Sequence, residues 1–214
     1  MSTPISIDLL ELMASKICHD LISPIGAVNN GIEFLEDMGE DAGDEINQLI
    51  SFSAQQASAK LQAFRMAYGA GGADGNIKIA DVYNSIESIV AAEKKIVQEW
   101  DPATKIAPEL PPKAFCKILT CVLLLSKECL PKGGTLSVHR ADNDDVVVTA
   151  RGENAGFRDG FVDALLLEVA QDELTPTFTH GYITGLLGQH YGYSFKAEVP
   201  EDGAVAIHMN LPLM

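Results

Sequence analysis

The residues with the clearest chemical potential lie near the start of the chain, in the stretch KICHDLISPIG at residues 16 to 26. This stretch places His19 directly before the acidic Asp20 and five residues before Pro24. A buried structural histidine, a metal ligand, a catalytic base and a phosphate carrier would all suit such a pair. The periodicity of the surrounding segment helps to separate these alternatives.

The segment around His19 has the periodicity of an amphipathic helix. When residues are placed about 100° apart, its apolar positions fall within a sector roughly 80° wide. The members of this apolar stripe are Leu10, Ala14, Ile17, Leu21, Ile25, Val28, Ile32 and Leu35. His19 lies about 160° from the centre of the stripe. We therefore expect an exposed histidine, although a merely solvated one is still an alternative.

The other residues on the exposed face are predicted to form a docking surface for a partner protein. They combine apolar, small and basic side chains, namely Leu12, Ser15, Lys16, Ile22, Ser23 and Gly26. Exposed apolar side chains gain nothing from water, but isolated ones are common on protein surfaces. Pro24 removes a helical hydrogen bond and should bend the helix, which would open space for a partner.

Other catalytic interpretations of the His-Asp pair find little support. Metal-dependent phosphohydrolases with this dipeptide need a further histidine upstream, and no histidine precedes His19. A hydrolase with His19 as base needs a positioned nucleophile; Ser15 and Ser23 are one turn away, but no nucleophile elbow is present. The cysteines lack C-x-x-C spacing and are expected to be reduced thiols; they are Cys18, Cys116, Cys121 and Cys129.

Composition limits the classes of partner. The chain has 214 residues, of which 47% are hydrophobic, so it can bury a substantial core. Its net charge of −15 repels nucleic acids and anionic lipids, and we expect neither as a partner. No run approaches the roughly 20 apolar residues of a membrane span, and the start lacks the basic residues and cleavage site of a secretory signal. These features predict a cytoplasmic protein.

Two regions are predicted along the chain. Helical patterns over residues 5–38 and 44–69, separated by the acidic turn EDMGEDAGDE, indicate a helical hairpin. The second helix has apolar residues at heptad spacing: Ile46, Ile50, Ala54, Ala57, Leu61, Phe64 and Tyr68. After the linker GAGGADG, the β-rich runs TLSVHR, DDVVVTAR and AVAIHMNLPL indicate an α+β region. We therefore expect domains at 1–72 and 73–214.

A hairpin alone buries only one face of each helix, so this one needs a partner. It could pack against its own second domain. Alternatively, two copies of the hairpin could form a four-helix bundle in a symmetric dimer.

The stretch SKICHDLISPI resembles the phosphoacceptor box of two-component sensor histidine kinases, in which an acidic residue and leucine or phenylalanine follow the histidine. His19, Asp20, Leu21 and Pro24 match this box. The resemblance implies that His19 lies on the solvent face of a dimeric four-helix bundle. An imidazole suits phosphoryl transfer because it is a good nucleophile near neutral pH.

The second region resembles a degenerate copy of the α/β-sandwich ATPase domain of the same kinases. The segment KILTCVLLLSKECLPKGGTLSV aligns with the kinase helix that ends before a P-x-G-G turn. Leu125 then replaces the metal-chelating asparagine, Glu128 replaces a lysine, and Gly152 of GENAG replaces the adenine-binding aspartate. HGYITGLLGQHYGYSF follows the last glycine-rich segment of the kinases, and NLPL matches their closing strand. These substitutions predict that the chain binds neither nucleotide nor metal.

A retained phosphoacceptor beside a lost nucleotide site resembles the ChpT-type histidine phosphotransferases of alphaproteobacteria. The resemblance implies a cytoplasmic homodimer that passes phosphoryl groups from the receiver aspartate of a hybrid kinase to His19, and on to response regulators similar to CtrA and CpdR. Asp20 would hold the imidazole, and the receiver would supply Mg²⁺. A catalytically silent receiver-binding scaffold and a divergent active kinase are the alternatives. Phosphate on His19 would exclude the first, and absence of nucleotide binding the second.

Overall fold

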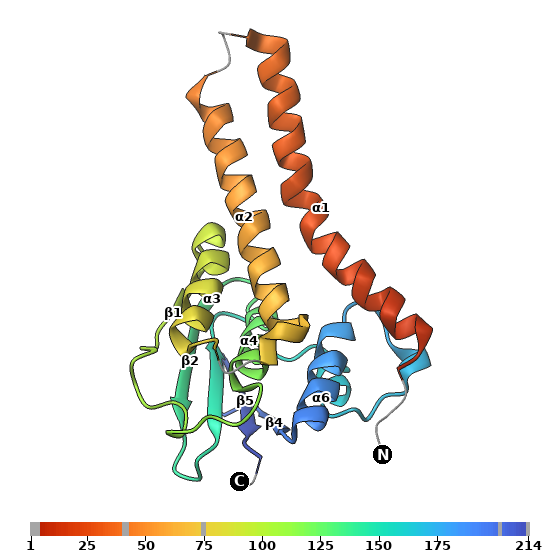
Figure 1. The fold of residues 1–214 in the computed structure, drawn as a ribbon, viewed down its shortest axis with the longest axis vertical. Coiled ribbons are helices and arrows are strands. Elements are labelled where there is room, and N and C mark those ends of the chain that lie inside the picture. The colour runs from red at the N-terminus through yellow and green to blue at the C-terminus, as the bar shows by residue number, and fades with distance from the viewer. Residues whose placement is uncertain (1–4, 40–42, 74–75, 201–202, 213–214) are drawn as a thin grey trace.

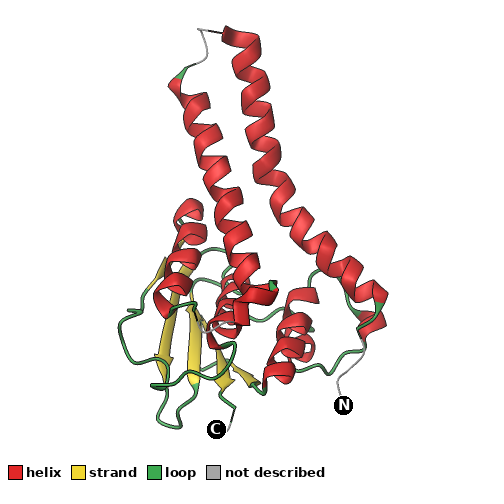
Figure 2. Cartoon of the chain, viewed as in Figure 1, coloured by secondary structure: helices red, strands yellow, loops and turns green. Residues whose placement is uncertain are grey.

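A computed structural model describes residues 5–39, 43–73, 76–200 and 203–212 (Figure 1). Two long helices project from a domain in which further helices pack beside a sheet, drawn in yellow in Figure 2. The α+β architecture expected from the sequence is therefore confirmed.

The first two helices, α1 (Ile7–Met38) and α2 (Asp44–Tyr68), form the expected antiparallel hairpin. Ser6 begins α1 because its hydroxyl oxygen accepts a hydrogen bond from the backbone N–H of Leu9 at 3.1 Å. Gly39 ends α1 with a φ of 55°, which favours glycine. Pro24 lies inside α1, and Figure 1 shows the N-terminal half of this helix leaning away from α2.

The two helices approach closely where the sequence offers a glycine. Gly31 is one of the few buried residues of α1, and it packs against the side chain of Ile50 in α2. A Cβ atom at position 31 would contact Ile50 too closely. By contrast, a Cβ atom at Gly26, also in α1, would meet no atom within 4 Å. The hairpin therefore depends on a small residue at 31 but not at 26.

The predicted apolar stripe of α1 differs from the face that α2 covers. The described buried residues of α1 are Leu9, Pro24 and Gly31, none of which belongs to the stripe. Within one chain, the exposed members of the stripe include Leu10, Ile25 and Ile32, at 54%, 52% and 44% exposure. The reason is that α2 packs on one side of the stripe rather than over it. A single hairpin thus leaves part of its apolar surface uncovered.

The C-terminal half of α2 packs on the second domain. Ala59, Ala63 and Ala67 are buried in the core of that domain, where their small side chains let α2 approach closely. The buried Lys117 caps the end of α2, since its ammonium group donates to the carbonyl oxygens of Ala67 and Gly69, both at 2.9 Å. One end of the hairpin is therefore joined firmly to the second domain.

The second domain consists of one sheet with helices packed against it. The strand order is β1-β2-β3-β5-β4, with β1 and β2 parallel and the other neighbours antiparallel. The strands are β1 (Ile96–Gln98), β2 (Gly134–Arg140), β3 (Val146–Arg151), β4 (Ser194–Glu198) and β5 (Ala204–Asn210). The helices are α3 (Ile79–Glu93), α4 (Phe115–Glu128), α5 (Phe161–Leu165) and α6 (Thr179–Tyr191), with the 3-10 turns η2 (Ala70–Ala73) and η3 (Gln171–Glu173).

Helix α4 is the centre of the core. Eleven of its fourteen residues are buried, including the polar Lys117, Thr120 and Ser126, so this helix is enclosed on nearly all sides. One hydrophobic cluster joins it to α2, α3 and the inner face of the sheet. This helix therefore carries Glu128, its last residue, on a rigid support.

The sequence predicted three of the five strands. The β-rich runs correspond to β2, β3 and β5, which lie in the middle of the sheet. The two strands at the edges, β1 and β4, were not predicted, because β1 has only three residues and β4 carries exposed polar side chains. Asp74 and Gly75 of the predicted linker and Leu213 of the predicted last strand lie outside the described residues.

The glycine contacts predict opposite effects of the same substitution at two places in α1. Gly26→Ala should raise the free energy of unfolding by about 0.5–1 kcal/mol, because alanine favours the helix and meets open space. Gly31→Ala should instead lower it by about 1 kcal/mol, since overpacking against Ile50 outweighs the gain in helix propensity. Urea denaturation measures both. Equal stabilisation by the two substitutions would contradict the close approach at Gly31.

Candidate functional site

His19 is the most exposed feature of the phosphoacceptor-like motif. Its side chain is 88% exposed, as the helical periodicity predicted. The ring nitrogen Nδ1 lies 3.4 Å from Oδ1 of Asp20. The other ring nitrogen, Nε2, has no hydrogen-bond partner among the residues that the structure describes. One side of the imidazole is therefore oriented while the other is open to solvent.

Asp20 is held by two lysines. Nζ of Lys16, one turn earlier in α1, forms an ion pair with Oδ2 of Asp20 at 3.0 Å. Nζ of Lys60 in α2 donates a hydrogen bond to the backbone carbonyl oxygen of Asp20, also at 3.0 Å. The residue next to His19 is thus fixed through both its side chain and its backbone. Sequence reasoning did not find Lys60, because the contact joins residues 40 positions apart.

Lys16 also links α1 to the second domain. Its Nζ lies 3.4 Å from Oε1 of Glu128 at the end of α4, and the same carboxylate oxygen lies 3.4 Å from Nδ1 of His180 in α6. His180 is 2% exposed, so this group of side chains stands at the edge of the core. The alignment with kinases singled out Glu128 as a replaced lysine, but it gave no sign of the contact with Lys16.

The ion pairs change the acidity of both partners. Burial alone would raise the pKa of Glu128, but the hydrogen bond and charge of His180 and the charge of Lys16 outweigh burial and lower this pKa to about 2. Burial alone would lower the pKa of Lys16, but the charges of Glu128 and Asp20 outweigh it and raise this pKa. Both groups therefore stay charged at neutral pH.

The structure divides the predicted docking residues into two groups. Ile22 is 69% exposed, and Ser15 and Ser23 of the same helix are also exposed. Gly26 is half-buried, with open space where a Cβ atom would lie.

Leu12 and Lys16 differ from the expected exposure. Leu12 packs against the small apolar cluster of Leu9, Leu174 and Tyr182, and Lys16 is half-buried in its ion pairs. The helix periodicity placed both on the exposed face correctly for an isolated helix. The second domain covers that part of α1, which the periodicity could not indicate.

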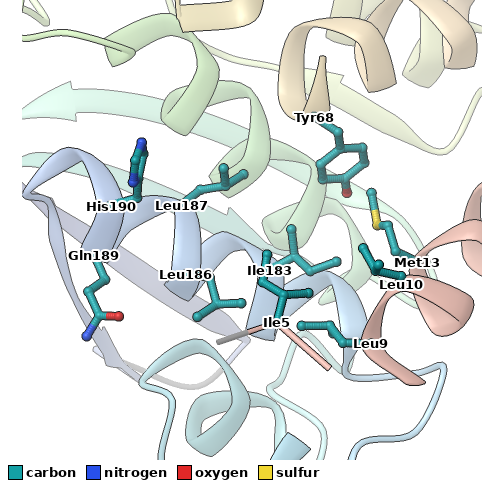
Figure 3. Close-up of a pocket in the computed structure, with 10 residues that line it drawn as sticks. All are labelled: Ile5, Leu9, Leu10, Met13, Tyr68, Ile183, Leu186, Leu187, Gln189 and His190. Atoms are coloured by element: carbon teal, nitrogen blue, oxygen red, sulfur yellow. The ribbon is translucent and has the colours of Figure 1, made fainter. Parts of the chain in front are cut away.

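An apolar cavity of about 760 Å³ lies between the start of α1 and α6, beside the place where the two helices touch (Figure 3). Its walls are mainly apolar side chains from the start of α1 and from α6, with Tyr68 of α2 at one end. The residues around it are Ile5, Leu9, Leu10, Met13, Tyr68, Ile183, Leu186, Leu187, Gln189 and His190.

The three positions that the resemblance aligns with nucleotide ligands have other roles here. Leu125 is fully buried in the core. Glu128 forms the ion pair with Lys16. A Cβ atom on Gly152 would overlap the carbonyl oxygen of Gly133, so the backbone occupies the space that an aspartate side chain would need.

Two further observations bear on function. Within the described residues, no three histidine, cysteine, aspartate or glutamate side chains gather so that they could hold a metal ion. None of the described helices combines the length and the apolar character that crossing a membrane requires.

The low pKa of Glu128 predicts a pH-dependent contribution to stability. At neutral pH, Glu128→Gln should lower the free energy of unfolding by about 1 kcal/mol, because a charged hydrogen-bonded group is lost. The contribution of a carboxyl with a depressed pKa is complete above its ordinary value of 4.5 and disappears as the pH falls towards 2. The wild-type and variant curves, measured by denaturation, should therefore converge between these pH values. A constant difference down to pH 2 would contradict the ion pair.

Comparisons with known proteins find a matching family and a similar full-length protein. The histidine phosphotransferase C-terminal domain family matches residues 79–203. The protein phosphotransferase ChpT of Brucella abortus (strain 2308) is 33% identical over 212 residues, which cover 96% of this chain and 98% of that protein.

Two solved structures are also similar. The structure of a bacterial phosphotransferase at 1.7 Å superposes with a TM-score of 0.78 at 30% identity, covering 97% of this chain and 98% of the other. The histidine kinase AdeS of Acinetobacter baumannii superposes with a TM-score of 0.47 at 10% identity, covering 91% and 97%. The family match over more than half of the chain and the full-length similarity to ChpT show that the chain belongs to the ChpT-type histidine phosphotransferases.

Proposed function

We propose that this phosphotransferase is the histidine-bearing step of a multi-step phosphorelay and that His19 is its transient phosphoryl carrier. The phosphoryl group would come from the receiver aspartate of a hybrid histidine kinase. It would leave to the receivers of response regulators similar to CtrA and CpdR. The observation that carries the proposal is the exposed imidazole whose Nδ1 faces Asp20 while Nε2 is open.

The geometry suits Nε2 as the attacking atom. A proton on Nδ1 is directed to the Asp20 carboxylate, which leaves the lone pair of Nε2 free. This lone pair attacks the phosphorus of the receiver's aspartyl phosphate, and a P–N bond forms as the P–O bond to the receiver carboxylate breaks. The carboxylate leaves with the bonding electron pair. Nδ1 keeps its proton, so the phosphorylated ring is positively charged, and Asp20 stabilises that charge.

The reverse reaction delivers the group to the next receiver. Because the phosphoryl group moves between an aspartate and a histidine, neither direction consumes ATP. We propose that the receiver holds the Mg²⁺ that neutralises the phosphoryl oxygens, and that this chain binds no cofactor.

The receiver should dock on the exposed face of α1. Ile22 offers an apolar contact beside His19, and the space around Gly26 allows close approach of a partner helix. Ser15 and Ser23 add polar contacts on the same helix. Leu12 and Lys16, which are half-buried, would support this face rather than contribute most of its area.

The second domain is proposed to bind no ATP. Leu125 cannot coordinate magnesium, and the backbone of Gly133 leaves no room for an acidic side chain at position 152. Calorimetry with Mg-ATP distinguishes this protein from a divergent kinase. A silent scaffold would bind receivers but would leave His19 unphosphorylated.

We also propose a cytoplasmic homodimer built through the hairpins. Ile25 and Ile32 of the apolar stripe are exposed in the single chain, and Leu61 of α2 is 50% exposed. Covering these side chains in a four-helix bundle would remove apolar surface from water. His19, on the other side of α1, would stay accessible in that dimer.

The dimer proposal predicts different effects of two similar substitutions in α1. Replacing Ile25 and Ile32 together by glutamate should produce monomers, because each unpaired charge buried in the bundle costs several kcal/mol. Ile22→Glu, which introduces a charge at an exposed isoleucine outside the stripe, should leave the dimer intact. Light scattering at micromolar concentration measures both masses. A monomeric wild-type protein would overturn the proposal.

The central prediction concerns phosphoryl transfer. His19→Ala should abolish phosphorylation by a phosphorylated receiver, while folding stays nearly unchanged because an exposed side chain contributes little to stability. His139→Ala, which removes another exposed histidine, should retain full transfer. Ile22→Glu should raise the receiver concentration needed for half-maximal transfer. Acid-labile phosphate on the His19→Ala protein would mean that His19 is not the carrier.

A further inference from the structure

The N-terminal half of α1 is attached to the second domain at two separate places. At its start, the backbone N–H of Ser6 donates to Oε1 of Gln171 at 2.8 Å, and Leu9 packs among residues of α5 and α6. Farther along, the ion pair of Lys16 with Glu128 joins α1 to the end of α4. The apolar cavity leaves another side of this half uncovered (Figure 3). The ion pair is thus an attachment within one helical turn of His19.

A continuous series of contacts leads from that attachment to the imidazole. Glu128 Oε1 lies 3.4 Å from Lys16 Nζ, which lies 3.0 Å from Asp20 Oδ2. The other carboxylate oxygen of Asp20, Oδ1, lies 3.4 Å from Nδ1 of His19. Each carboxylate oxygen of Asp20 therefore has one partner, and the Lys16 ammonium group is held between Glu128 and Asp20.

Glu128 is well placed to fix this series. It ends α4, the most buried helix of the domain, and its carboxylate also contacts the buried His180. A lysine side chain is flexible and loses its orientation when a partner is removed. Without Glu128, the Lys16 side chain would be more mobile, and the Asp20 carboxylate would be held less firmly towards His19.

We propose that Glu128 is a positioning residue for phosphoryl transfer: through Lys16 it fixes Asp20, and through Asp20 it fixes the imidazole of His19. The inference rests on the proposed function of His19 as phosphoryl carrier. It gives the second domain a part in the reaction that requires no nucleotide. The negative charge of Glu128 at the end of α4 binds Lys16 of α1, the helix that carries His19.

The test is a single-turnover transfer assay with the full-length protein. The donor is a purified hybrid-kinase receiver domain from the same organism, phosphorylated on its aspartate, over a range of concentrations. Glu128→Gln should lower the maximal transfer rate about tenfold, because reacting groups lose orientation. The receiver concentration at half-maximal rate should not change, since Glu128 does not belong to the docking face. Glu153→Gln, which removes an ion pair with Lys132 elsewhere in the second domain, is the matched control and should transfer at the wild-type rate.

A second variant tests whether Glu128 acts through Lys16. Lys16→Met keeps much of the side-chain length and removes the charge, so it should cause a similar loss of maximal rate. Combining it with Glu128→Gln should cause no further loss, because the two residues belong to one series of contacts. Thermal unfolding of each variant confirms that the proteins are folded at the assay temperature.

The possible results distinguish this inference from the proposed function. If the wild-type protein gains no phosphate on His19, the proposed function fails and this inference with it. If the wild-type protein transfers and Glu128→Gln does so at the same maximal rate, only the positioning role is overturned. A raised half-maximal concentration at an unchanged maximal rate would make Glu128 a receiver contact instead. Losses that multiply in the double variant would also overturn the role through Lys16.

Discussion

Two helices cannot enclose a hydrophobic core by themselves, and the rest of this molecule depends on that constraint. One end of the hairpin satisfies it within the chain: the alanines of α2 are buried in the second domain, and Lys117 caps the last carbonyl groups of α2. The other end leaves the side chains of Ile25 and Ile32 exposed. The covered end fixes the hairpin to a rigid body, and the uncovered end supplies the surface for the proposed dimer.

The position of the reactive group, His19, follows from this contrast between the covered and uncovered ends of the hairpin. His19 lies between the two ends of the hairpin, on a side of α1 that neither α2 nor the apolar stripe occupies. The chain as a whole has a net charge of −15, yet Lys16 and Lys60 both contact Asp20 beside the imidazole. Local positive charge therefore balances the carboxylate at the one place where a phosphoryl group is proposed to arrive.

The second domain has a complete sheet and a continuous hydrophobic core. Two of the positions that align with nucleotide ligands in kinases serve packing here. Leu125 fills the interior, and Gly152 allows the backbone at Gly133 to pass closely. Glu128 instead reaches out of the domain to α1. We interpret the second domain as a support that orients α1, the helix that carries His19. This role needs rigidity but no ligand.

The sequence by itself determined the features that depend on local periodicity. These are the two long helices and the exposure of His19, which follow from apolar side chains recurring about every 3.6 residues, and the three central strands, which appear as runs rich in β-forming residues. Family likeness in the motif around His19, together with the replaced nucleotide ligands of the second region, predicted the phosphotransferase, which the comparisons confirm.

Only the tertiary structure decided which neighbours of His19 are exposed. Leu12 and Lys16 share its face on a helical wheel, but the second domain covers them. The edge strands β1 and β4 and the contact between Lys16 and Glu128 were likewise absent from the prediction. The physical reason is that contacts between residues far apart in the chain leave no periodic pattern, since they depend on how whole elements pack against one another.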